Sequence, residues 1–135
     1  MEDVNLLAVL VATIAAFVLS GAWYAVLGNS VVRLQGKEPD PNDPSQQMPP
    51  WKIVVELLRS LVVAFVLANI IVRLGVGSWT EALTYGLWLW LAFPLILLVG
   101  SVIHENVSWR LAAIHGGDWL VKILLMAVIL GVWRR

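Results

Sequence analysis

Four long apolar segments constrain the fold of this chain more than any other feature of its sequence. They cover residues 4–27, 52–74, 82–103 and 111–133. An α-helix of about 20 apolar residues crosses the hydrocarbon core of a bilayer, and a helix satisfies its own backbone hydrogen bonds where there is no water. We therefore predict an all-α protein, a single domain that forms an integral membrane four-helix transmembrane bundle.

The composition indicates that a bilayer, rather than water, is the main solvent. The chain is 60% hydrophobic and 13% charged, whereas a soluble domain is about half apolar and about a quarter charged. The formal net charge is zero, which argues against nucleic acid as a partner because that binding requires a concentrated basic surface. The absence of cysteine excludes disulfides, thiolate metal sites and thiol catalysis.

The first apolar segment is expected to be a span rather than a secretory signal peptide. It follows an acidic start, Met-Glu-Asp, and it is longer than the apolar region of a signal peptide. Small residues recur at every fourth position, and this spacing lets helix backbones approach closely. These residues predict a packing seam, formed by Ala8, Ala12, Ala16 and Ser20.

Residues 28–51 are expected to form the one long loop. They hold five of the six prolines and include the run EPDPNDPSQQMPP, a composition typical of extended or irregular chain. Asp40 and Asp43 in this run have the chemistry to touch a cation, but we interpret the stretch as a solvated loop.

The second segment carries four polar residues on one arc of the helix. Glu56, Arg59, Asn69 and Arg73 fall within roughly 140° of one another at about 100° per residue. The opposite arc is Val, Leu, Ile and Ala. We therefore expect the polar face to point into the bundle and the apolar face to point into lipid.

The last segment contains three ionisable residues that share one helical face. His115, Asp118 and Lys122 follow one another at spacings of three and four, which brings them onto the same side of a helix. Such residues inside a membrane normally face protein or water. The neighbouring pair Gly116–Gly117 permits either close helix contact or a local break in the helix.

Alternating helix directions bring the polar residues of the second and fourth spans to one side of the membrane. With Trp51 and Arg110 taken as the interface, Glu56 and His115 lie roughly 7 Å deep, Arg59 and Asp118 roughly 12 Å, and Lys122 about 18 Å. The sequence therefore predicts a polar pocket in one half of the bundle, formed by Glu56, Arg59, His115, Asp118 and Lys122. Two interpretations stay open: a salt-bridge cluster that fixes helix packing, and a functional pocket for a proton, ion, headgroup or small ligand.

His104 and Glu105, at the end of the third segment, are further ligand-binding candidates. With His115 and Asp118 they supply residue types that bind a metal or the metal of a pigment or haem. The spacings HxxxH and ExxH and the nucleophile motif GxSxG are absent. We therefore expect no metal site, no catalytic residues and no cofactor, with a pigment or haem at His104 or His115 as the alternative.

The sequence also resembles a known family. The stretch GAWYAVLG at 21–28, with LQG at 34–36, resembles the end of the first helix in a bacterial family known as domain of unknown function 1761. The stretch SWRLAAIHGGDWLVKILLMAVILGVW is similar to that family's closing helix, which ends in Gly-x-Trp, here Gly131 and Trp133. The resemblance implies a small four-span protein of the bacterial inner membrane and no established activity.

Three functions are compatible with these observations. The favoured hypothesis is a structural or accessory subunit that packs in the bilayer against other membrane proteins or against copies of itself, without enzymatic activity. The second is a minimal transporter or proton or ion relay that uses the buried charges. The third is a membrane subunit that binds a pigment or haem through His104 or His115.

Overall fold

The computed structural model describes residues 4–133, which contain helices and no strand. Four helical rods are long and apolar enough to cross a membrane, so the prediction of an all-α four-span protein is confirmed. Their elements are α1 (Leu6–Leu34), α2 (Pro50–Arg73), α3 (Trp79–Trp90) continued through a π-helical turn (Leu91–Leu95) into α4 (Ile96–Glu105), and α5 (Trp109–Val132). A 3₁₀ turn, η1 (Pro44–Gln46), lies in the loop between α1 and α2.

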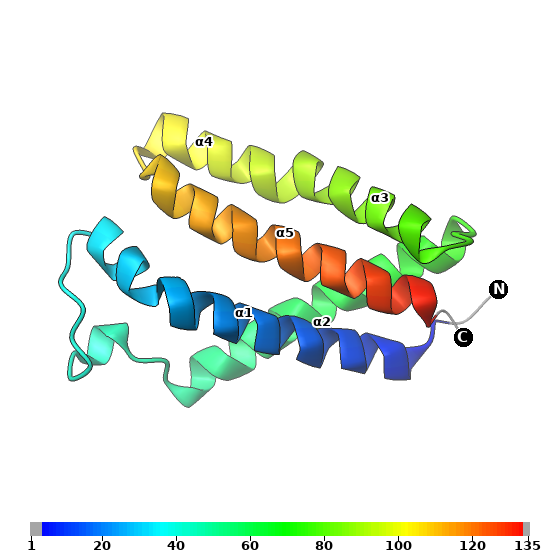
Figure 1. Ribbon diagram of the computed structural model, residues 1–135, viewed down its shortest axis with the longest axis horizontal. Coiled ribbons are helices and arrows are strands. Elements are labelled where there is room, and N and C mark those ends of the chain that lie inside the picture. The colour runs from blue at the N-terminus through cyan, green and yellow to red at the C-terminus, as the bar shows by residue number, and fades with distance from the viewer. Residues whose placement is uncertain (1–3, 134–135) are drawn as a thin grey trace.

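Helix α5 occupies the centre of the molecule. It packs against α1, α2, α3 and α4, while α1 also packs against α2. Figure 1 shows α5 between α1 and the α3–α4 rod, with α2 crossing behind. The loop that joins α1 to α2 and the turn that joins α4 to α5 lie at the same end, which we call the loop end (Figure 1).

Helix α1 continues to Leu34, beyond the predicted end at residue 27. Gly28 and the polar residues after it have modest helix propensity, but no proline follows before Pro39, so nothing forces the helix to stop. It ends where Gly36 takes a positive φ of 83°, a conformation that glycine adopts without steric strain. The irregular chain between α1 and α2 is therefore 35–49 rather than the predicted 28–51.

The π-helical turn contains Pro94. Proline has no N–H, so in an α-helix it would leave the carbonyl of Trp90 without a hydrogen bond and its ring would clash with that carbonyl. A wider turn at Leu91–Leu95 accommodates the ring without ending the rod, as neighbouring helices permit in membrane proteins.

Small side chains bring α1, α2 and α5 into close contact. The core holds Ala8, Ala12 and Ala16 from α1, Ala64 and Ala68 from α2, and Met126 and Ala127 from α5. Three residues of the predicted seam, Ala8, Ala12 and Ala16, are completely buried, and Ser20 is only partly covered. Van der Waals packing of this kind drives association where lipid is as apolar as the helices themselves.

Candidate functional site

Two residues of α5, Asp118 and Lys122, form an ion pair that is buried among the helices. Lys122 Nζ lies 2.9 Å from Asp118 Oδ2, and each residue is only 2% exposed. The acid precedes the base by one helical turn, which is the more favourable order on a helix. Because α5 is the central helix, its neighbours exclude lipid from both side chains, as intramembrane charges require.

Trp119 lies against the positive charges of the site. The ammonium of Lys122 is 3.7 Å from the centre of the Trp119 ring, and the guanidinium carbon of Arg59, on α2, is 5.4 Å from it. An indole face attracts a cation through its quadrupole, more strongly when water is excluded. Trp119 was not among the residues predicted to form the pocket. Its position between Asp118 and Lys122 in the sequence was the signal that could have identified it.

The two carboxylate oxygens of Asp118 have different surroundings. Oδ2 contacts Lys122, whereas Oδ1 is buried and accepts no hydrogen bond from any described residue. Most buried polar atoms in proteins are hydrogen-bonded. Asp118 is therefore an acceptor that the described residues satisfy only in part.

Tyr24 and His115 join α1 to α5 on the loop-end side of the ion pair. The Tyr24 hydroxyl lies 2.6 Å from His115 Nδ1, and both side chains are half-buried. We call this pair, together with the side chains of the ion pairs and ring contacts, the polar cluster: Tyr24, Glu56, Arg59, His115, Asp118, Trp119 and Lys122.

Gly116 and Gly117 allow two indoles to lie against the backbone of α5. Trp23 on α1 donates to the Ile114 carbonyl at 3.0 Å, and Trp90 donates to the Gly116 carbonyl at 2.9 Å. A Cβ on Gly117 would lie 2.7 Å from the Trp23 ring. Since α5 is continuous through this point, the glycines provide close contact rather than a break in the helix.

The expectation that the polar face of α2 points into the bundle is wrong. The buried residues of α2 are Ser60, Ala64, Leu67, Ala68 and Ile71, on the opposite face. Glu56 and Arg59 form an ion pair of 2.6 Å, but their side chains are 30% and 53% exposed. Small residues at spacings of four permit the closest helix packing. The face of α2 that carries Ser60, Ala64 and Ala68 therefore packs against the other helices.

His104 and Glu105 lie apart from the polar cluster. Both are exposed at the end of α4, just before Asn106 reverses the chain with a positive φ of 56°. Within residues 4–133, no group of three or more His, Cys, Asp or Glu side chains is arranged to hold a metal ion.

Asp40 and Asp43 accept hydrogen bonds from N–H groups of the same loop. Asp43 accepts hydrogen bonds from the Ser45 N–H at 2.9 Å and the Ser45 hydroxyl at 2.8 Å, and Asp40 accepts from the Asn42 N–H at 2.9 Å. The bonds from Ser45 hold the pKa of the Asp43 carboxyl below its usual range. These carboxylates therefore have a structural role as turn caps.

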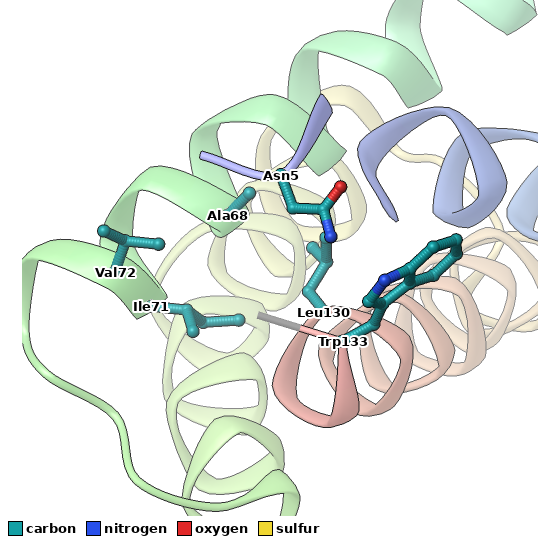
Figure 2. A pocket seen from close by; sticks show the side chains of 6 residues that line it. All are labelled: Asn5, Ala68, Ile71, Val72, Leu130 and Trp133. Atoms are coloured by element: carbon teal, nitrogen blue, oxygen red, sulfur yellow. The ribbon is translucent and has the colours of Figure 1, made fainter. Parts of the chain in front are cut away.

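The core of the opposite half of the molecule is mainly apolar, with Thr13 as a buried polar residue. Beyond Lys122, the buried side of α5 continues with Ile123, Met126, Ala127 and Leu130. A cavity between Asn5, Ala68, Ile71, Val72, Leu130 and Trp133 is shown in Figure 2. Its volume of about 10 Å³ is at the lower limit for one water molecule, so it cannot hold a larger ligand. The polar cluster therefore extends from Lys122 toward the loop end, and not toward the opposite end.

Comparison with known proteins gives one match. The family described as "Protein of unknown function (DUF1761)" matches residues 7–131. No curated protein and no solved structure matches the chain.

Proposed function

The chain belongs to the DUF1761 family of proteins of unknown function, and we propose that it binds and releases protons at its buried Asp118–Lys122 pair. In this proposal the protein is a multi-pass, non-enzymatic membrane protein, either a minimal transporter or a proton relay. The observation that carries the proposal is Asp118 itself, buried near the middle of a spanning helix with only one oxygen paired.

A purely structural ion pair would be expected to satisfy both oxygens of its carboxylate. A buried acceptor left without a partner costs about 1–3 kcal/mol, and more when it is charged. Replacement of a buried ion pair by apolar residues is often neutral or stabilising. An incompletely paired carboxylate at membrane depth is therefore better explained by a functional role than by packing.

The arrangement favours access from the loop end. His115 lies one turn from Asp118 on that side and contacts the Tyr24 hydroxyl. The imidazole and the hydroxyl are groups that can exchange protons, and they lie between Asp118 and the loop end. On the other side, the core residues are apolar. This supports a proton-binding site reached from one face, as in a carrier or a sensor, rather than a channel open through the membrane.

Infrared difference spectroscopy of the protein in liposomes tests the proposal. On acidification, we expect a carboxyl C=O band that Asp118→Asn removes and that Glu56→Gln, at the partly exposed carboxylate of α2, leaves unchanged. We also expect the band to respond to pH on the loop-end face. Absence of any difference between wild type and Asp118→Asn, while the protein stays folded, would show that Asp118 does not exchange protons. An absorbance band of a bound pigment or haem would replace this proposal with the third hypothesis.

An accessory role is the second candidate. In the rod Trp79–Glu105, only 6% of the most apolar stretch is buried within the chain, against 39% in α5. This rod is therefore the least buried of the four spans and is open to lipid or to other subunits. Purification from native membranes in mild detergent, followed by native mass spectrometry, supports the accessory role if the chain is recovered with another protein at fixed stoichiometry.

A further inference from the structure

A hydrogen bond joins two titratable side chains from different helices, one turn from the buried carboxylate. Tyr24 belongs to α1 and His115 to α5, and the hydroxyl oxygen lies 2.6 Å from the ring Nδ1. The adjacent Trp23 already holds α1 against α5, because its indole N–H donates to the Ile114 carbonyl at 3.0 Å and its ring lies against Gly117. The bond between Tyr24 and His115 is therefore not required for packing and is available for a chemical role.

The chemistry of the two groups determines which atom carries the shared hydrogen. A phenol O–H is a stronger donor than an imidazole N–H, and an unprotonated ring nitrogen is a stronger acceptor than a phenol oxygen. The Tyr24 hydroxyl therefore donates to Nδ1 of neutral His115, and the ring carries its own hydrogen on Nε2. Because Nε2 is protonated and Nδ1 is occupied, the hydroxyl controls the arrival of a further proton at the ring.

We propose that Tyr24 and His115 are the relay by which protons reach and leave Asp118 from the loop end. The inference rests on the proposed proton binding at Asp118 and adds the residues that carry the proton. A proton from water binds the Tyr24 oxygen while the hydroxyl hydrogen passes to His115 Nδ1, so the tyrosine stays neutral and the ring becomes an imidazolium. The imidazolium then gives its Nε2 proton to Asp118 Oδ1, the oxygen that accepts no hydrogen bond from any described residue. Release follows the same steps in reverse.

The charges of the polar cluster favour transfer of the proton over its retention on His115. The charged members of the cluster are Glu56 and Arg59 on α2 and Asp118 and Lys122 on α5. From α3, the Trp90 indole adds an uncharged N–H, which donates to the Gly116 carbonyl. A cationic ring is disfavoured by the two cations, and each carboxylate already has one oxygen paired with one of them. The unpaired Oδ1 of Asp118 is thus the acceptor for the proton of the ring.

Nitrogen-15 NMR of the histidine-labelled protein in liposomes tests the direction of the bond. The chain has two histidines, so His104→Gln leaves His115 as the one labelled ring. For the neutral ring we expect an unprotonated Nδ1 and a protonated Nε2, and Tyr24→Phe should convert this state into a mixture of tautomers. Tyr85→Phe is the matched control, since Tyr85 is the only other tyrosine. A protonated Nδ1 in the neutral ring, or a spectrum that Tyr24→Phe leaves unchanged, would overturn the proposal.

Time-resolved infrared spectroscopy separates the relay from the proton-binding site itself. After a rapid fall in pH on the loop-end face, we expect Tyr24→Phe and His115→Gln each to slow the rise of the Asp118 carboxyl band by at least about tenfold. The final amplitude of the band at low pH should stay the same, which a loss of structure around Asp118 would not allow. Tyr85→Phe and His104→Gln should leave the rate unchanged.

The two inferences fail in different ways. A band that rises at the wild-type rate in Tyr24→Phe and in His115→Gln would exclude the relay and leave proton binding at Asp118 intact. Absence of the band from the natural chain would exclude proton binding at Asp118 and the relay with it. If a variant does not fold, the tautomer of His115 in the presence of Tyr24 still decides the proposal.

Discussion

Lys122 contacts two different groups inside the bundle. Asp118 supplies a carboxylate oxygen at 2.9 Å, and Trp119 supplies the face of its ring at 3.7 Å from the ammonium to the ring centre. The two contacts compensate for the loss of hydration near the middle of the span. Because Asp118 and Lys122 are both buried, removal of one leaves the other without the charge that it was positioned to meet.

Lys122→Met is expected to destabilise the protein more than the loss of both charges does. The single change leaves Asp118 as an unpaired carboxylate in the membrane, and breaking a buried pair in this way costs about 3–5 kcal/mol. The double variant Asp118→Asn, Lys122→Met contains no stranded charge and should lie closer to the wild type. The measurement is the free energy of unfolding in mixed micelles, and a double variant at least as unstable as Lys122→Met would contradict the argument.

The packing of α3 on α5 depends on glycine at two places. A Cβ on Gly131 would lie 2.8 Å from the Ala82 Cβ and 2.9 Å from the Trp79 Cα, and one on Gly86 would lie 3.3 Å from the Ala127 Cβ. Trp79 contributes backbone at this contact, so a rotamer change cannot relieve the overlap. The start of α3 is positioned by its Ser78 cap, whose hydroxyl accepts from the Glu81 N–H at 3.2 Å, and this leaves the helix little freedom to move away.

Gly131→Ala is expected to separate these helices and to lower the free energy of unfolding by about 1–3 kcal/mol, as overpacking does elsewhere. Gly100→Ala is the matched control, because a Cβ there meets nothing within 4 Å. In a helix, that change should be neutral or raise stability by about 0.4–1 kcal/mol. Equal effects of the two substitutions, measured under the same conditions, would show that the contact at Gly131 is not tight.

In the molecule as a whole, the polar cluster lies toward the loop end, whereas the core beyond Lys122 is mainly apolar. The loop 35–49, the end of α4 and the polar cluster lie toward one end, and the core of α1, α2 and α5 continues to the other. This polarity, rather than any single contact, determines from which face water and ions reach Asp118. It therefore applies whether the protein acts alone or within a complex.

Labelling of single cysteines from each face of the membrane measures this polarity. Ser45→Cys marks the loop end, His115→Cys lies in the polar cluster, and Met126→Cys lies in the apolar core, where Met126 is completely buried. With a membrane-impermeant maleimide, we expect Ser45→Cys to react rapidly and His115→Cys slowly, both from the same face, and Met126→Cys to stay unlabelled. Reaction of His115→Cys only from the face opposite Ser45→Cys would refute one-sided access.

Much of the architecture is readable from the sequence because a bilayer permits few structures. Each apolar segment of sufficient length must be a helix, and the rise per residue then gives the depth of every charge along it. The four spans, and the placing of Asp118 at a depth similar to that of Arg59 with Lys122 deeper, follow from these two rules. The end of α1 was missed because helix continuation past a span meets no barrier until Gly36 changes the backbone conformation.

Side-chain contacts between helices were decided only by the tertiary structure. In water, polarity shows which side of a helix is buried, but lipid is as apolar as a protein core, so the buried and lipid-facing sides of a membrane helix have similar composition. The rotation of α2 was therefore not readable from Glu56, Arg59, Asn69 and Arg73, and the packing of Ala64 and Ala68 determined it instead. The sequence by itself determined how many helices cross the membrane and how deep their charges lie. The tertiary structure alone decided which groups meet, because contacts such as Tyr24 with His115 depend on helix rotation.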